Sequence, residues 1–128
     1  MVKKLEILVV DDEQGYRDLF TYMLEPMGII VDCVTDGRQA VDKVEQRPYD
    51  VILMDVHMPN MTGPEALKKI KVIRPEQKVI MFSSSSDPEY HLEKQAEKDG
   101  AMECLFKPVE ILEIQRVLKK ALGDGFNA

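Results

Sequence analysis

Cysteine is scarce in this sequence, which argues against a disulfide-rich protein and against a cysteine metal site. The two cysteines, Cys33 and Cys104, are too few for a disulfide framework and lack the close spacing of a metal site. We therefore expect both to be reduced residues of the core.

Long apolar runs are also missing. No run approaches the length of a membrane-spanning helix, and the apolar run at residues 5–10 leads directly into acidic residues, unlike a secretory signal. We therefore expect a cytoplasmic protein with no membrane partner.

Clustered positive charge is the third absence. The formal net charge is -6 and the pI is near 4.9, and Lys and Arg are scattered rather than gathered into a patch that could follow a phosphate backbone. This distribution argues against direct nucleic-acid binding. The sequence also has no internal repeat and no Pro/Gly/Ser-rich linker, so its 128 residues are predicted to form one domain over residues 1–128.

Short apolar runs alternate with longer segments of helical periodicity. The runs are rich in β-branched residues, and this alternation is typical of a parallel α/β sheet. The predicted strands are residues 5–10, 29–34, 51–54, 78–82 and 103–106. The predicted fold class is therefore a five-stranded, doubly wound α/β sandwich.

Apolar stripes mark the first and last of five predicted helices. The stripe of the first helix consists of Tyr16, Leu19, Phe20, Met23 and Leu24. The stripe of the last helix, over residues 109–122, consists of Ile111, Ile114, Leu118, Ala121 and Leu122. Both stripes are expected to pack against the sheet.

Capping residues mark where the middle helices begin. The second helix begins at Asp36, the third at Thr62 with Glu65 completing a capping box, and the fourth at Asp87 before a proline. The fourth has few apolar positions among its charged neighbours. The positions expected to be buried in it are Tyr90, Leu92 and Ala96. We therefore expect this helix to be the least firmly held.

Reactive side chains follow four of the five predicted strands. They are Asp11 and Asp12, Asp55, Ser83 and Ser84, and Lys107. The carboxyl ends of parallel strands meet at one edge of a sheet, where α/β proteins bind ligands. Three acids gathered at that edge would repel one another unless a cation neutralised them, and all-oxygen ligands suit Mg²⁺.

Each of these strand ends has an ordinary structural explanation when it is taken alone. Asp-Asp-Glu after a strand is often only a polar turn, the serine run suits a solvated loop, and Lys-Pro can simply end a strand. An acid pair, an acid, a hydroxyl and a lysine at four of the five strand ends would require a coincidence at each one. The joint pattern therefore favours a functional site.

The sequence resembles the response-regulator receiver domains of two-component signalling over essentially its whole length. The matching motifs are ILVVDDE at residues 7–13, DVILMDVHMPNMTG at 50–63, VIMFSS at 79–84, and GA at 100–101 with KP at 107–108. The resemblance implies a flavodoxin-like sheet with strand order 2-1-3-4-5. It also implies a phosphorylation-activated signalling switch that acts as a regulator rather than as a stand-alone enzyme.

The resemblance also assigns roles to residues. Asp55 would accept the phosphoryl group, and the Mg²⁺ ligands would be Asp12, Asp55 and the backbone carbonyl of His57, with Asp11 acting through water. The donor would be a phosphohistidine on a sensor histidine kinase or a histidine phosphotransfer protein. The target would be a downstream protein or output domain that the sequence does not identify.

Phosphoryl transfer itself needs positioning and charge neutralisation more than a strong nucleophile. The Lys107 ammonium, the Ser83 hydroxyl and a backbone N–H near Ser84 are expected to contact the phosphoryl oxygens. The positions of His57 and Ser85, two residues after Asp55 and Ser83, are expected to face the route of an attacking water, so both residues are candidates for setting the phosphoryl lifetime. A catalytic role for the His57 imidazole is the weaker alternative to a role for its carbonyl.

Other functions and two departures from the family bear on this prediction, and one departure is Ser84, where the family usually has alanine. An aspartyl phosphatase usually has a second acid where this chain has His57. A flavin carrier needs a phosphate-binding loop after the first strand, where this chain has three acids. A degenerate receiver used only for docking would lack part of the set of Asp11, Asp12, Asp55, Ser83 and Lys107, which this chain has in full. Cys104 replaces the aromatic residue that the family usually has on the fifth strand. We therefore expect signalling without an aromatic rotamer, through the fourth helix, fifth strand and fifth helix.

Overall fold

A central parallel sheet organises the chain, whose computed structural model describes residues 4–84, 90–123 and 126. The strands are β1 (Glu6–Val10), β2 (Ile30–Val34), β3 (Val51–Asp55), β4 (Val79–Ser84) and β5 (Glu103–Lys107). Their order is β2-β1-β3-β4-β5, and every neighbouring pair is parallel. The predicted strand order and fold class are both confirmed.

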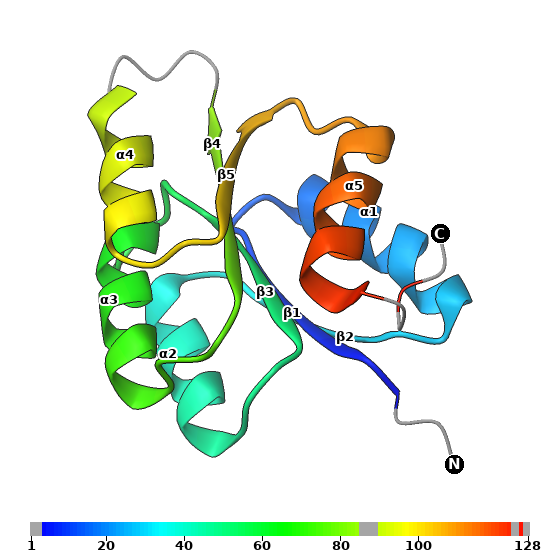
Figure 1. The fold of residues 1–128 in the computed structure, drawn as a ribbon, viewed down its shortest axis with the longest axis horizontal. Coiled ribbons are helices and arrows are strands. Elements are labelled where there is room, and N and C mark those ends of the chain that lie inside the picture. Colours follow the sequence, from blue (N-terminus) through cyan, green and yellow to red (C-terminus); the bar gives the residue numbers. More distant parts are fainter. Residues whose placement is uncertain (1–3, 85–89, 124–125, 127–128) are drawn as a thin grey trace.

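Helices cover both faces of the sheet. They are α1 (Gln14–Leu24), the short 3₁₀ helix η1 (Glu25–Met27), α2 (Gly37–Gln46), α3 (Gly63–Ile73), α4 (Tyr90–Lys98) and α5 (Ile111–Leu122). Figure 1 shows α2, α3 and α4 on one face and α1 and α5 on the other. None of the helices in these described ranges is long and apolar enough to cross a membrane.

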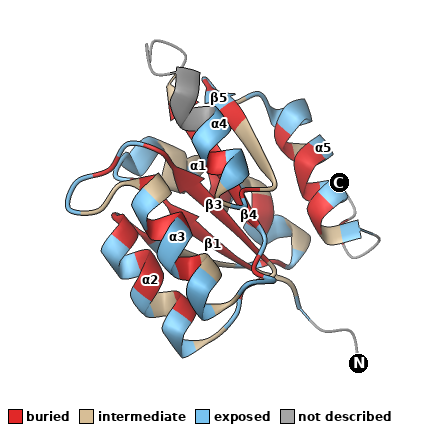
Figure 2. Ribbon diagram, turned by 60° about the vertical axis from the view of Figure 1, so that its left-hand side comes forward, coloured by how far each residue is buried: buried red, intermediate tan, exposed pale blue. Residues whose placement is uncertain are grey.

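Alternating side chains of the central strands build two cores, one on each face. In β3, which is buried throughout, Ile52 and Met54 pack toward α2 and α3, whereas Val51 and Leu53 pack toward α1 and α5. Buried positions therefore run along the sheet and along one side of α1, α2, α3 and α5 (Figure 2). A strand covered on both faces must be apolar throughout, which explains its continuous apolar sequence.

The helix boundaries follow the capping residues. The Asp36 carboxylate accepts a hydrogen bond of 2.9 Å from the backbone N–H of Gln39, and Thr62 and Glu65 form the predicted capping box. The α4 helix buries Ala96 as expected. The predicted cap at Asp87 and the predicted burial of Tyr90 and Leu92 lie outside the described side chains.

Two expectations about core residues were wrong. Cys33 is exposed because β2 is an edge strand, and Cys104 is only half-buried on the opposite edge strand. Neither cysteine forms a disulfide bond. In α5, Ile111 is 55% exposed because it lies in the first turn, and Val117 takes a buried place that the expected stripe did not include. Leu122 is only partly buried.

Candidate functional site

Four carboxylates converge beyond the ends of β1 and β3. Because Val10 pairs with Met54, the next residues, Asp11 and Asp55, lie side by side where the two strands end. Asp11, Asp12, Glu13 and Asp55 each offer an oxygen, and these oxygens lie within 4.8 Å of one another. Asp11 and Asp55 are buried, whereas Asp12 and Glu13 are exposed. The cluster therefore has a buried floor and a solvent-facing rim.

Lys107 brings positive charge to this cluster from the end of β5. Its ammonium donates a hydrogen bond of 2.8 Å to Asp11 and lies 3.3 Å from Glu13 and 3.5 Å from Asp55. The ammonium also lies 4.0 Å from the centre of the Tyr16 ring, a cation–π contact. The side chain is 9% exposed, so its charge acts in a region of reduced solvent screening.

The Asp55 carboxylate is costly to ionise, because it is buried and because one lysine does not neutralise this set of acids. Burial raises the pKa of the Asp55 carboxyl to about 6, and the negative charges of Asp11 and Asp12 add to that rise. The Lys107 charge and a hydrogen bond from the backbone N–H of His57 act in the opposite direction. For Lys107 itself, burial lowers the pKa, but the contacts with Asp11 and Asp55 outweigh burial and raise it. The site therefore lacks positive charge.

Ser83 is placed beside Asp55 by the pairing of β3 with β4. Asp55 pairs with Phe82, and the N–H of Val56 donates a hydrogen bond of 2.8 Å to the Phe82 carbonyl, so Ser83 is the next residue along this edge. The Ser83 side chain is 2% exposed, and Ser84 is the last residue of β4. The predicted hydroxyl therefore lies at the same edge as the acids, while Ser85 lies outside the described residues.

The loop between β3 and α3 is held tightly against the strand end. A Cβ added to Gly63 would lie 2.3 Å from the Asp55 carbonyl oxygen, and the Gly63 N–H donates a hydrogen bond of 2.9 Å to the Val56 carbonyl. Asn60 has a φ of 67° and donates a side-chain hydrogen bond of 2.9 Å to Asp36, the N-cap of α2. The backbone around Asp55 is therefore fixed from two helices.

The family of the chain follows from its sequence matches. Residues 7–119 match the family described as the response regulator receiver domain. The chain belongs to this receiver family. Receiver domains are the regulated modules of two-component systems, and the relatives of this one are response regulators and the receiver domains of sensor kinases.

Transcriptional regulatory protein ZraR of Escherichia coli O157:H7 is one relative of this receiver domain. It is 36% identical over 119 residues, which are 93% of this chain and 26% of that protein. The receiver domain therefore spans about a quarter of the length of that relative.

Two solved structures are similar to this receiver domain. Chemotaxis protein CheY4 of Vibrio cholerae has a TM-score of 0.82 and 29% identity over 94% of this chain and 100% of its own. The receiver domain of sensor histidine kinase PA1611 from Pseudomonas aeruginosa PAO1 has a TM-score of 0.80 and 30% identity over 95% of this chain and 100% of its own. In that second structure a magnesium ion is coordinated in the active site cleft.

The donor set of this receiver domain fits a hard divalent cation. All four clustered side chains offer carboxylate oxygens, two of them open to solvent, and the raised pKa of Asp55 shows that further positive charge would be stabilising there. Hard cations such as Mg²⁺ prefer oxygen ligands and keep several waters. The acidic cluster is therefore compatible with Mg²⁺.

Two contributors to the site were not among the predicted site residues. Glu13 joins the acidic cluster and Tyr16 contacts the ammonium of Lys107. The third acid of the Asp-Asp-Glu motif could have indicated Glu13. Tyr16 was expected only in a core stripe, and no local pattern shows that its ring also meets a lysine 91 positions away in the sequence.

Proposed function

We propose that this receiver domain, acting in the cytoplasm, accepts a phosphoryl group from a partner phosphohistidine onto Asp55. The observation that carries the proposal is the environment of Asp55. This carboxylate is 5% exposed, has a raised pKa, and lies within 3.5 Å of a lysine among further acids. A structural aspartate does not need such a costly arrangement, whereas a phosphoacceptor that alternates between charge states does.

Mg²⁺ would be held by Asp12, Asp55 and the backbone carbonyl of His57, with Asp11 acting through a bound water. The ion would supply charge neutralisation for the phosphoryl oxygens when bound. Asp11 is already engaged by Lys107 and by the backbone N–H of Glu13, so its oxygens are oriented before any ion arrives. This prior engagement supports an indirect role for Asp11.

The transfer is a displacement at phosphorus. An oxygen of the Asp55 carboxylate forms a bond to phosphorus, the bond from phosphorus to the imidazole nitrogen of the partner breaks, and the imidazole takes a proton. The Lys107 ammonium, the Ser83 hydroxyl and the backbone N–H of Ser84 would contact the equatorial oxygens. Water attack on the acyl phosphate then returns the carboxylate and inorganic phosphate, so the domain acts as a switch that resets itself.

The lifetime of the phosphoryl group would depend on residues along the approach of that water. The side chain of His57 is exposed two positions after the acceptor. Ser85, two positions after Ser83, is the second candidate from the sequence. Both would control access of water rather than form a bond to phosphorus.

The signal would leave through α4, β5 and α5. Phosphorylation is proposed to draw Ser83 toward Asp55 and to shift the segment that connects β4 to α4. On the same side of the molecule, Phe106, Ile111 and Leu112 are exposed apolar side chains, at 49%, 55% and 79%. A downstream protein or output domain could bury them, and their exposure therefore supports this output surface.

Incubation with acetyl phosphate and Mg²⁺, followed by intact mass measurement, tests the proposed function. We expect the wild-type chain to gain the mass of one phosphoryl group, and we expect no gain in chelator or in the Asp55→Asn variant. A chain that gains no mass with Mg²⁺ would be a docking scaffold instead. A phosphatase would release phosphate catalytically from added esters, which we do not expect.

A further inference from the structure

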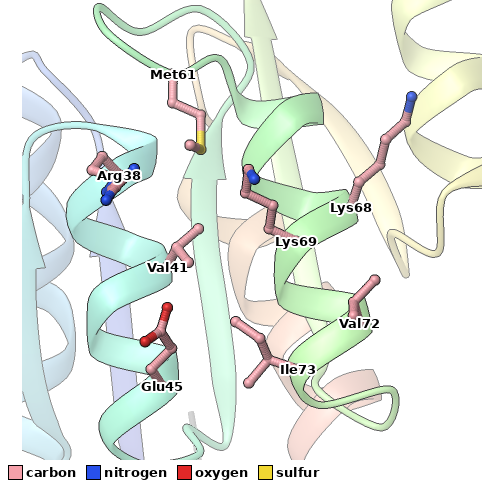
Figure 3. A pocket seen from close by; sticks show the side chains of 8 residues that line it. All are labelled: Arg38, Val41, Glu45, Met61, Lys68, Lys69, Val72 and Ile73. Carbon is pink, nitrogen blue, oxygen red and sulfur yellow. The ribbon is translucent and has the colours of Figure 1, made fainter.

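A basic and apolar groove lies between α2 and α3. Its volume is about 540 Å³. Arg38, Val41 and Glu45 line it from α2, Lys69 and Ile73 line it from α3, and Met61 lies at its upper end (Figure 3). The groove lies on the face of the sheet opposite α5, although α3 also contacts α4 of the proposed output surface (Figure 1).

The two lysines of the groove differ from their neighbours in how they are paired with the rest of the described structure. Among the described residues, neither Lys68 nor Lys69 has an ion pair or a side-chain hydrogen bond. Two other basic residues of the same segment do have partners, since Lys71 donates to the carbonyl of Gln77 and Arg74 donates to that of Val44. Lys71 and Arg74 therefore stabilise the fold, whereas Lys68 and Lys69 line the groove and are available to a partner.

Arg38 adds a third positive charge to the groove from α2. Within the described part of the chain, the one ion pair of Arg38 is with Asp42, 3.9 Å away and one turn along the same helix, and both side chains are more than half exposed. Such an exposed pair contributes little. Glu45 is the single acid among the lining residues. The groove is therefore locally basic on a chain whose net charge is -6.

Exposed aliphatic side chains accompany these charges. Val72 is 83% exposed and Ile73 is 38% exposed, and both line the groove with Val41 and Met61. Two adjacent parallel or antiparallel helices leave a groove into which the apolar ridge of a third helix can pack. An apolar floor with a basic rim matches a helix that has an apolar face and acidic flanks.

We propose that the groove between α2 and α3 binds an acidic amphipathic helix of a partner protein. Apolar side chains of that helix would cover Val72 and Ile73, and its carboxylates would pair with Arg38, Lys68 and Lys69. This proposal does not depend on phosphorylation of Asp55. It adds a second docking surface to the one proposed at α4, β5 and α5.

The probe for the test is a synthetic helical peptide of about 15 residues, long enough to form several helical turns. It has leucine at i, i+3, i+4 and i+7 and glutamate on both flanks, and its control has lysine in place of each glutamate. The peptides are titrated into the ¹⁵N-labelled chain, and amide shifts are followed. We expect saturable shifts in residues 38–45 and 61–73 with the glutamate peptide and none with the lysine peptide.

Matched variants separate the contributions of charge and apolar contact. Lys68→Glu with Lys69→Glu should weaken binding of the glutamate peptide about tenfold or more, because attraction becomes repulsion at two positions. Val72→Ser should weaken binding without changing any charge. The control variant combines Lys4→Glu with Lys119→Glu, two exposed positions outside the groove, and changes the net charge by the same amount as the groove variant. Its affinity for the glutamate peptide should stay within about twofold of the wild-type value.

Three results would overturn the proposal. The first is equal binding of the two peptides, and the second is a set of shifts that lies mainly outside the groove. The third is self-association of the unliganded chain in analytical ultracentrifugation that Lys68→Glu with Lys69→Glu abolishes, because the occupant would then be a second copy of this chain.

Discussion

Lys107 donates a hydrogen bond of 2.8 Å to Asp11 although two strands, β3 and β4, lie between the strands that carry them. The lysine side chain therefore passes over the strand end that presents Asp55, from which its ammonium lies 3.5 Å away. Before phosphorylation the ammonium is bound mainly by Asp11. A phosphoryl group on Asp55 would offer it a stronger partner, so this side chain can report the state of the site.

Lys107→Ala should impair switching more than folding. The expected loss is the α4 amide-shift response to a phosphoryl mimic such as beryllofluoride, because the phosphoryl group would lack its charged partner. In Mg²⁺ the ion can neutralise Asp11 and Asp55, so the free energy of unfolding should fall less than in the core truncation Leu53→Ala, for which about 2–5 kcal/mol is typical. An equal fall in the two variants would make the lysine a structural residue.

Asp55→Asn should stabilise the chain in chelator, and by an amount that depends on pH. The pKa of Asp55 is raised from 3.8 to about 6, so its ionisation costs the folded state free energy as the pH rises between these values. Removing the charge should therefore raise the free energy of unfolding by up to about 3 kcal/mol at pH 7 and by little near pH 4. Urea titrations at both pH values measure this difference, and a pH-independent difference would contradict it.

Added Mg²⁺ provides the control for that measurement. The ion stabilises the folded wild-type chain by binding to it, whereas the Asn variant offers one carboxylate fewer. We therefore expect Mg²⁺ to narrow the difference between the two chains at pH 7.

Gly63→Ala should disturb the acceptor loop. The added methyl group would lie 2.3 Å from the Asp55 carbonyl oxygen and 2.9 Å from the Val56 Cα, and neither backbone atom can move without shifting the strand end. We expect a loss of about 1–3 kcal/mol in unfolding free energy and slower phosphorylation. Gly15→Ala is the matched control, because a Cβ there meets nothing within 4 Å and the residue is in α1. Equal effects of the two substitutions would refute this role for Gly63.

Ser83→Ala and Cys104→Ala should separate two routes of signal transmission. Ser83 is buried beside the acceptor strand, whereas Cys104 is a small, half-buried side chain on β5. We expect Ser83→Ala to blunt the shifts of α4 amides on addition of beryllofluoride and Cys104→Ala to leave them mostly intact. The reverse order would argue for transmission through β5.

The strand order was predicted from the resemblance to receiver domains. The meeting of Asp11, Asp12, Asp55 and Lys107 was predicted from the sequence pattern itself, because the ends of parallel strands converge at one edge. The sequence did not predict the burial of side chains whose exposure depends on whether their strand is central or at the edge of the sheet. The exposure of Cys33 follows from its place on the edge strand β2, which a local apolar run does not reveal.

Long-range side-chain contacts were also beyond the reach of local patterns. Asn60 is bound by Asp36 from a different loop, and its φ of 67° becomes understandable only with that contact. The cation–π contact of Tyr16 with Lys107 depends in the same way on two elements at opposite ends of the chain. Periodicity indicates which face of a helix is apolar, but it does not identify the partner of an individual side chain.

Borohydride trapping of the phosphorylated chain tests the central claim most directly. An acyl phosphate is reduced to an alcohol, which converts the modified aspartate to homoserine, and peptide mass spectrometry then locates the change. We predict homoserine at position 55 alone, and only after incubation with Mg²⁺ and acetyl phosphate. Homoserine at position 11 or 12, or a phosphorylated chain with no reducible aspartate, would contradict the assignment of Asp55 as the phosphoacceptor.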